Sequence, residues 1–405
     1  MASLAMSSSN GETTKTHFNI LMIGPSGSGK TVYLAALWKK LNVPARGSLD
    51  FYLSLPDQQD KINILNSIYE TVAFESEWPP GTANVSSWSF DCRVRKNDGK
   101  TVKALTFNYL DYAGGNFGGY ADVDQEVQKA IRNADGYLVL VDGLRLLQLH
   151  QGKKPGMKWA VQFGSTVIPP LLQDATKPTQ FVISKWDVLQ SAGLSLQDCK
   201  RLLFEKIRQV SEYVRPLVED AMMKGDRRAS IRIYPVSSVG EQFAWYDEAN
   251  DAMHKREDVF PEPFNVECPL TSLIPLYIEQ QIYAEQEELK RAREAEVLLG
   301  KRPELDLEGG IRVGMKKGFD GLSQLPFAGP LFKWVGEGIG GDAERQHAER
   351  VKSHEASLQK ILKQQGDIAD ELRAQQYCCD MFLKGMHTFE AMNPECLVSI
   401  RDLPV

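Results

Sequence analysis

The chain has 405 residues, of which 42% are hydrophobic and 25% charged, and its formal net charge is -6 with an isoelectric point near 5.7. These values are typical of a globular protein that is long enough for two domains, or for one large domain with a tail. The acidic balance argues against nucleic-acid binding as the main function. No run of about 18 uncharged apolar residues occurs, so we expect no transmembrane helix.

The first residues and the cysteines indicate in which cellular compartment the protein is expected. Residues 1–16 are rich in Ser, Thr, Asn and Gly and lack the apolar core of a signal peptide, so we expect a disordered lead-in. The six cysteines have no metal-ligand spacing, and the adjacent Cys378 and Cys379 do not form a C-x-x-C motif. Scattered cysteines in a chain of this size indicate reduced thiols and a cytoplasmic location.

Strand and helix patterns alternate between residues 17 and 240. The expected strands are 18–23, 87–94, 103–111, 136–141, 179–183 and 231–236, and the expected helices are 32–41, 57–74, 124–134, 158–172 and 196–223. Asn97-Asp98-Gly99 is a hairpin-turn signal, so the strands on either side of it pair antiparallel at one edge of the sheet. Alternating strands and helices predict an α/β fold with crossover connections.

Beyond residue 240 the patterns are less regular. We expect a long loop over 240–268, a helix over 270–299, and two helical pieces over 342–392 that break near Gly366. Residues 309–341 hold ten glycines between aromatic and basic residues. They fit either peripheral contact with a membrane or a flexible linker whose aromatic side chains dock on the chain's own domain. The expected organisation is a lead-in over 1–16, a main domain over 17–298, a glycine-rich linker or docking segment over 299–341, and a helical C-terminal extension over 342–405.

The most specific motif is a glycine-rich loop. Residues 24–31 read Gly24-Pro25-Ser26-Gly27-Ser28-Gly29-Lys30-Thr31, between an expected strand and an expected helix. This is the phosphate-binding pattern G-x-x-x-x-G-K-[ST] in the context that it requires. The glycines let successive backbone N–H groups point at one anion, and the helix N-terminus adds its dipole. Lys30 reaches the terminal phosphates and the Thr31 hydroxyl can bind Mg²⁺, so the chain is expected to bind a nucleoside triphosphate. The fold is then a P-loop three-layer sandwich, with a mostly parallel sheet and one antiparallel edge strand.

An acidic residue ends the expected strand 103–111. Asp111 is followed by Tyr112, Ala113 and Gly114. An acid at a strand tip opposite the phosphate loop can hold Mg²⁺ directly or through water. Gly114 can present its N–H to the γ-phosphate because no side chain crowds it. The alternative for Asp111 is the capping of a plain turn.

The tetrapeptide Ser184-Lys185-Trp186-Asp187 follows another expected strand. A carboxylate there can accept hydrogen bonds from the N1 and N2 donors of guanine, a pair that adenine does not offer. Lys185 can lie over the base and brace the phosphate loop. The tetrapeptide therefore predicts selection of guanine, although a polar strand end with a capping acid is the plainer alternative.

Four segments resemble, in the same order along the chain, the motifs of a Ras-like GTPase of the translation-factor-related class. They are 24–31, 111–114, 184–187 and 237–238, and the resemblance covers about residues 17–240. The resemblance implies GTP and GDP as substrate and product, with Mg²⁺ as the cofactor. It also implies that a threonine of the first switch binds Mg²⁺ and the γ-phosphate. Thr82 is the best candidate, and Thr71 is the runner-up.

By this resemblance, the catalytic residues are Lys30, Thr82 and Gly114, and the metal ligands are Thr31, Thr82 and Asp111. The nucleotide-binding residues are Gly24, Ser26, Gly27, Ser28, Gly29, Lys30, Thr31, Ser184, Lys185, Asp187, Ser237 and Ser238. The segments Trp78-Pro79-Pro80-Gly81-Thr82 and Asn265-Val266-Glu267-Cys268-Pro269-Leu270 resemble those of bacterial double-GTPase-type proteins.

Three departures from the family pattern matter. Ser184 replaces the usual Asn or Thr of the guanine motif, and the loop at Ser237 and Ser238 lacks the usual Lys. Gly115 stands where many relatives carry a Gln that orients the attacking water. We therefore expect slow intrinsic hydrolysis that a protein partner, or self-association, accelerates in trans. Asn116, Lys129 and Arg132 are candidate substitutes within the chain.

The sequence thus predicts a cytoplasmic, Mg²⁺-dependent GTP-binding switch that signals to a protein partner. One alternative is a nucleotide-binding scaffold with little turnover, which Gly115 favours. Another is a P-loop ATPase, which would need a second acid beside Asp111 as a base, whereas Tyr112 stands there.

Overall fold

The structure is a computed structural model that describes residues 17–43, 51–80, 86–95, 101–111, 125–172, 177–224, 231–300 and 343–404. The chain divides into two compact units. The first comprises Met1–Gln281 with Ala374–Val405, and the second comprises Ile282–Arg373. Thr82, Gly114, Gly115, Asn116 and most of the glycine-rich segment lie outside the described residues.

The first unit is built on one twisted sheet. The described strands are β1 (His17–Ile23), β2 (Phe51–Ser54), β3 (Ser86–Arg95), β4 (Thr101–Asp111), β5 (Gly136–Asp142), β6 (Thr179–Ser184) and β7 (Ile233–Pro235), in the spatial order β2-β3-β4-β1-β5-β6-β7. β1 is parallel to both β4 and β5, and β6 is parallel to both β5 and β7. β3 is antiparallel to β2 and β4, so the predicted antiparallel strand at one side of a mostly parallel sheet is confirmed.

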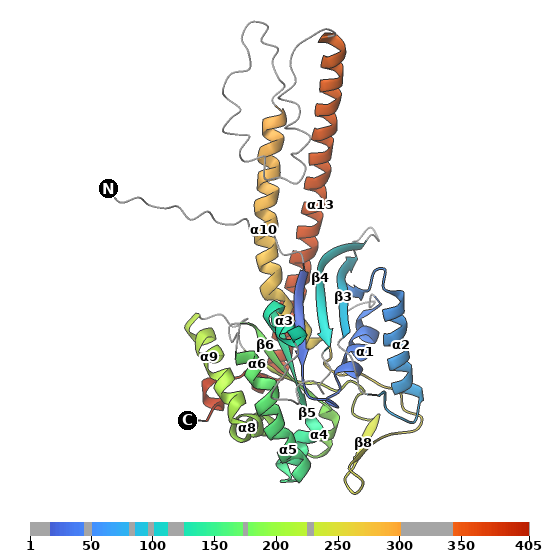
Figure 1. The fold of residues 1–405 in the computed structure, drawn as a ribbon, viewed down its shortest axis with the longest axis vertical. Helices are drawn as coiled ribbons and strands as arrows, with labels where there is room; N and C mark the ends of the chain where they lie inside the picture. Colours follow the sequence, from blue (N-terminus) through green and yellow to red (C-terminus); the bar gives the residue numbers. More distant parts are fainter. Residues whose placement is uncertain are drawn as a thin grey trace, which may run out of the picture. The chain divides into compact units, whose positions relative to one another are not determined.

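Helices cover both sides of these strands (Figure 1). The described helices are α1 (Lys30–Leu41), α2 (Gln59–Phe74), α3 (Gln125–Asn133), α4 (Gly143–His150), α5 (Lys154–Gln162), α6 (Ile168–Leu172), α7 (Trp186–Ser191), α8 (Leu196–Lys206), α9 (Arg208–Lys224), α10 (Cys268–Gly300) and α13 (Ala343–Met392). Only the start of α10 and the end of α13 belong to the first unit. Every residue of β5 and β6 is buried, which explains the continuous apolar run of β5 and the apolar Phe181-Val182-Ile183 at the centre of β6. The α/β three-layer architecture is the predicted one.

Several sequence expectations are corrected. Residues 240–268 are not a plain loop, because they contain the antiparallel pair β8 (Ala244–Asp247) and β9 (Ala252–Lys255). α13 runs without a break through Gly366, since one glycine in a helix interior costs only about 1 kcal/mol. The expected helix 196–223 is divided at Ile207, and the expected helix 158–172 contains a π-helical turn over Phe163–Val167.

The end of the chain packs within the first unit. Leu397 forms an antiparallel bridge with Arg232, and the Val398 N–H donates to the Ile231 carbonyl at 3.0 Å. The C-terminal segment thereby covers the outer edge beside β7. Among the helices that the structure describes, none combines the length and the apolar character that a membrane span requires.

Candidate functional site

The phosphate-loop motif connects β1 to α1, as its sequence predicts. Gly27 and Gly29 have φ angles of 80° and 91°, which side chains rarely adopt, so the loop requires glycine at both positions. A Cβ on Gly24 would lie 2.9 Å from the Leu140 carbonyl oxygen, so the loop also packs too closely against β5 for a side chain there. No side chain caps the start of α1, and its first turn holds no acid. The first N–H groups of the helix are thus suited to an anion.

The polar side chains of the loop hold its shape. The buried Ser28 hydroxyl donates to the Pro25 carbonyl at 2.8 Å. The Lys30 ammonium donates to the Gly24 carbonyl at 2.8 Å and to the Pro25 carbonyl at 3.0 Å. Lys30 therefore lies along the inside of the loop, whereas Ser26 is exposed at its tip. Thr31, the next residue of α1, is half-buried.

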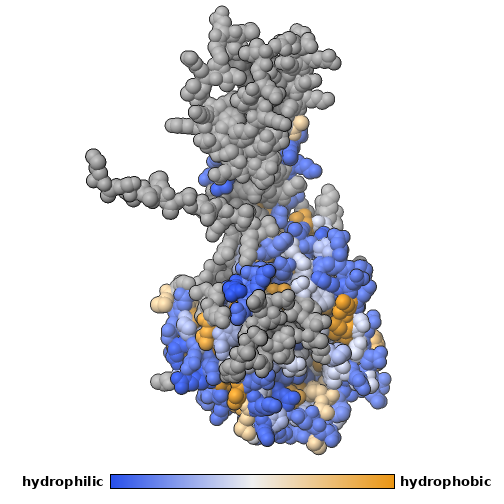
Figure 2. Space-filling view, in the orientation of Figure 1, coloured by the Kyte–Doolittle hydropathy of each residue, from blue (hydrophilic) through white to orange (hydrophobic). Residues whose placement is uncertain are grey.

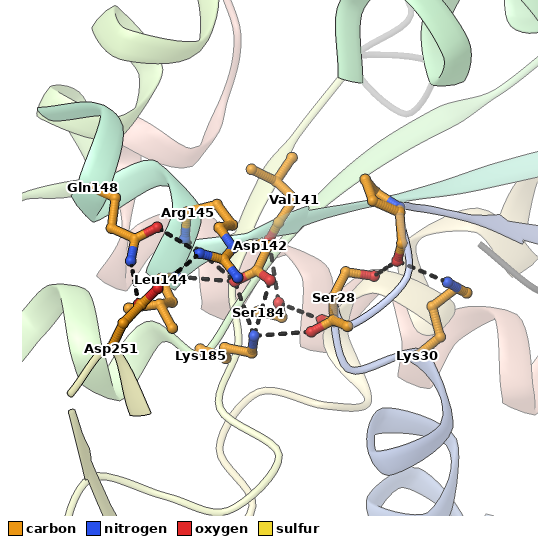
Figure 3. A network of polar contacts seen from close by, with 12 residues as sticks. Ser28, Lys30, Val141, Asp142, Leu144, Arg145, Gln148, Ser184, Lys185 and Asp251 are labelled. Atoms are coloured by element: carbon orange, nitrogen blue, oxygen red, sulfur yellow. Dashed lines mark hydrogen bonds and ion pairs between the residues drawn. The ribbon is translucent and has the colours of Figure 1, made fainter. Parts of the chain in front are cut away.

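Two consecutive residues at the end of β6, Ser184 and Lys185, bind the phosphate loop. The Ser184 hydroxyl lies 2.7 Å from the Ser28 carbonyl and 3.2 Å from the Val141 carbonyl, both of which are acceptors. The Lys185 ammonium donates to the Gly27 carbonyl at 2.9 Å. The predicted bracing of the loop by Lys185 is therefore present, and Ser184 contributes a second contact of the same kind (Figure 3).

A residue that the sequence analysis missed completes this arrangement. Asp142, at the end of β5, accepts hydrogen bonds from the Lys185 ammonium at 3.0 and 2.9 Å, one on each carboxylate oxygen. The same carboxylate caps α4 by accepting from the N–H groups of Leu144 at 3.0 Å and Arg145 at 3.4 Å. Its side chain is only 5% exposed. The sequence feature that could have identified Asp142 is an aspartate at the end of a buried strand and before a helix, because aspartate is a preferred N-cap residue.

The residue after Asp142 fixes the distance between α4 and the loop after β6. A Cβ on Gly143 would lie 2.3 Å from the Ser184 carbonyl oxygen, which no packing tolerates. Glycine therefore allows the two loops to touch, and it brings Asp142 within reach of Lys185.

Asp187 is buried at the start of α7. It accepts a hydrogen bond from the Ser237 hydroxyl at 2.7 Å, and the Ser237 oxygen in turn accepts from the Gly240 N–H at 2.8 Å. Burial raises the pKa of the Asp187 carboxyl above its usual range, and the Ser237 hydrogen bond and the Lys185 charge act against that rise. The carboxylate is thus held in one orientation by the loop that follows β7.

The remaining predicted residues are placed as follows. Asp111 is the last residue of β4 and pairs in register with Met22, two residues before Gly24, so the end of β4 lies beside the phosphate loop. The Ser237 N–H is not open to a ligand, because it donates to the Phe264 carbonyl at 3.2 Å. Ser238 follows it and is half-buried.

Comparison with known proteins bears on this site. The model of the family described as Double-GTPase 1 matches residues 21–154, a span that includes the phosphate loop and Asp111 and ends before Ser184. Among solved structures, the signal recognition particle receptor SRb-GTP/SRX complex from Chaetomium thermophilum is similar, with 14% identity and a TM-score of 0.32, over 56% of this chain and 93% of that chain. A likeness that distant transfers no residue roles. No curated protein matches the chain.

Proposed function

We propose that this chain, a P-loop GTPase of the double-GTPase type by its residues 21–154, is a Mg²⁺-dependent switch. In this proposal it binds GTP, hydrolyses it slowly to GDP and phosphate, and signals to a protein partner. The observation that carries the proposal is the direct bonding of the segment 184–187 to the phosphate loop, through Ser184 to Ser28 and through Lys185 to Gly27. A base-selecting segment and a phosphate-binding loop joined in this way form a single nucleotide site.

The choice of guanine rests on Asp187. An ionised carboxylate accepts hydrogen bonds, so it complements the adjacent N1–H and N2–H donors of guanine. Adenine instead presents a donor beside an acceptor along the same edge, and the acceptor would face the carboxylate. The hydrogen bond from Ser237 favours the ionised form that this role needs. The Ser238 backbone is proposed to contribute a contact to the base.

The residues around the loop also fit Mg²⁺. A hard cation prefers oxygen ligands, and Thr31 offers a hydroxyl on α1 while Asp111 ends the neighbouring β4. Thr82 is proposed as a further ligand. When bound there, Mg²⁺ would neutralise negative charge on the phosphates. In the proposal Lys30 binds the same phosphates, and Gly114 presents its N–H to the γ-phosphate.

Slow turnover and a partner are proposed together. Gly115 has no side chain to orient water, so a group supplied in trans by a partner or by a second copy would speed hydrolysis by orders of magnitude. All six cysteines are free thiols, which supports the proposed cytoplasmic location. Peripheral membrane contact through residues 309–341 stays a proposal from sequence.

The test is equilibrium binding of fluorescent GDP, GTP and ATP to the purified full chain, with and without Mg²⁺, in wild type and Asp187→Asn. The asparagine amide would face the guanine donors with a donor of its own, whereas it complements the N1–H and O2 edge of xanthine. We expect Mg²⁺-dependent guanine binding in wild type and a switch to xanthine nucleotides in the variant. Binding of ATP that does not respond to the substitution would refute the proposal.

A scaffold that binds GTP with little turnover is the second candidate, and Gly115 favours it. Single-turnover hydrolysis separates the two. Release of phosphate within hours, accelerated by a partner, supports the switch, and no release over days supports the scaffold.

A further inference from the structure

The segment between β7 and α10 contains the β8–β9 pair, and the turn of this pair is bonded to α4. The Asp247 carboxylate shapes the turn, because it accepts from the Ala249 N–H at 2.9 Å and from the Asn250 side-chain amide at 2.7 Å. Asp251 ends the turn with a φ of 51°, in the left-handed region that side chains rarely adopt. The turn thus presents the Asp251 carboxylate in a defined position to a residue of α4.

That residue is Gln148, which is 1% exposed. Its amide nitrogen donates to the Asp251 carboxylate at 2.6 Å and to the Tyr246 hydroxyl of β8 at 3.0 Å. Its amide oxygen accepts from the Arg145 guanidinium at 2.8 Å, and Arg145 also lies 3.8 Å from Asp251 (Figure 3). These contacts use both donors and the oxygen of the amide. Because a buried amide that loses its partners is costly, the contacts hold α4 and the β8–β9 pair in one arrangement.

α4 connects this amide to the candidate nucleotide site. The helix has eight residues, and a helix of that length is not stable without tertiary contacts. Asp142 caps its first turn, and Gln148 lies in its last turn. The contacts of Gln148 therefore help to fix where the Asp142 carboxylate lies, and that carboxylate binds the Lys185 ammonium at 3.0 and 2.9 Å.

Lys185 depends on contacts of this kind. Its φ of 52° also lies in the left-handed region, so neighbouring groups have to hold it there. Its ammonium is bound between the Asp142 carboxylate and the Gly27 carbonyl, at 2.9 Å from the latter. A displacement of α4 would move the carboxylate and weaken the hold of the ammonium on the phosphate loop. Polar contacts thus run from Asp251 through Gln148 and α4 to Gly27 (Figure 3).

We propose that Gln148 is a positioning residue for the nucleotide site. It fixes α4 against the β8–β9 pair, and it thereby holds Asp142 where that carboxylate can bind Lys185 and keep the phosphate loop in shape. The inference rests on the proposed function, in which Lys185 braces the loop that binds a guanine nucleotide. GDP and GTP share the base and the phosphates nearest to it, so loss of Gln148 affects the binding of both.

The test compares Gln148→Met with Gln151→Met in the full chain. Methionine keeps a stem of similar length and removes the amide. Gln151 follows the same helix, and its amide donates to Glu248 in the same turn at 3.2 Å. That contact is exposed, on a unit whose described surface is largely hydrophilic in the view of Figure 2, so water can replace it. Dissociation of fluorescent GDP and of a non-hydrolysable GTP analogue is measured by stopped flow in Mg²⁺.

A second pair of variants tests the contact with Asp251 itself. Gln148→Glu places a carboxylate where the amide meets Asp251, and like charges at that distance repel each other. Adding Asp251→Asn exchanges the amide and the carboxylate between the two positions. The pair can then form again, and Arg145 keeps a carboxylate within reach.

We expect Gln148→Met to speed dissociation of both nucleotides about fivefold, and Gln151→Met to change it less than about twofold. Gln148→Glu should speed it about tenfold, and the added Asp251→Asn should bring the rates back to within about threefold of wild type. In an Asp142→Asn background, Gln148→Met should add less than about twofold, because both changes act through the same contact of Lys185.

Hydrogen exchange of residues 143–147 and 185–188 gives a readout that needs no nucleotide. Gln148→Met should speed exchange in both stretches, and Gln151→Met should not. Unchanged exchange at 185–188, or an equal effect of Gln148→Met with and without Asp142→Asn, would overturn the positioning role and leave the proposed function intact. Failure of the wild-type chain to bind any guanine nucleotide would overturn both.

Discussion

A buried ion pair joins the sheet to the C-terminal segment, and breaking it should strongly destabilise the first unit. Arg232, directly before β7, donates from Nε to Glu390 of α13 at 2.6 Å, and the two side chains are 0% and 3% exposed. Replacing one member removes the opposite charge that faces the other, buried side chain, which costs about 3–5 kcal/mol. The Arg232 main chain would be spared, because its N–H donates to Gln180 at 2.7 Å whatever side chain it carries.

The assay is urea unfolding of Arg232→Met, Glu390→Leu and the double variant, monitored by fluorescence. With a urea m-value of about 3 kcal/mol/M, each single change should lower the midpoint by about 1 M or more. The double variant replaces both charges by apolar groups, so it should lie within about 1 kcal/mol of wild type or above it. The matched control is Arg208→Met, which breaks an exposed pair with Glu212 and should cost under about 0.5 kcal/mol.

The result that refutes this reasoning is additivity. If the free energy of unfolding falls in the double variant by the sum of the two single losses, the two charges do not compensate each other. Packing alone would then explain the stability. Single losses as small as that of Arg208→Met would also refute it, because they would mean that the C-terminal segment is not bound to the sheet through this pair.

Two further predictions concern the nucleotide site. Asp142→Asn keeps an oxygen to cap α4 but removes the negative charge opposite Lys185. GDP and GTP should therefore both dissociate about tenfold faster in a stopped-flow displacement assay. Unchanged dissociation rates would show that Lys185 needs no carboxylate partner. Ser237→Ala removes the hydrogen bond that lowers the pKa of Asp187, so that pKa should rise further. As the pH falls, the variant should then lose guanine binding at a higher pH than wild type does. A Kd–pH profile that superimposes on that of wild type would contradict this.

The phosphate loop and the buried strands were predictable because the information for them is local. Gly27 and Gly29 occupy left-handed backbone positions that few other residues adopt, so the motif itself nearly dictates the turn. β5 and β6 are covered on both faces, so β5 is apolar from Tyr137 to Val141 and the centre of β6 is Phe181-Val182-Ile183. Such signals do not depend on distant parts of the chain.

The missed elements depend on distant partners. β2 has only four residues and is defined by its pairing with β3, with Phe51 opposite Val94. The β8–β9 pair is held by Gln148 on α4 and by carbonyls at the end of α2, none of which is near it in sequence. Local propensity cannot reveal a strand whose stability comes from such contacts.

The role of Ser184 also emerges only from the contacts. The Ser184 side chain is shorter than the Asn that is usual at this position in the family that the motif resembles. A hydroxyl has one proton, however, and here it lies between two backbone carbonyls, with that of Ser28 the nearer. Ser184 therefore has no second donor for a base while it holds the phosphate loop. In the proposed function, the carboxylate of Asp187 then selects guanine, while Ser184 and Lys185 hold the phosphate loop in position. This division of roles explains why a serine is sufficient at position 184. Its hydroxyl keeps the hydrogen bond to the Ser28 carbonyl, which joins the segment 184–187 to the phosphate loop.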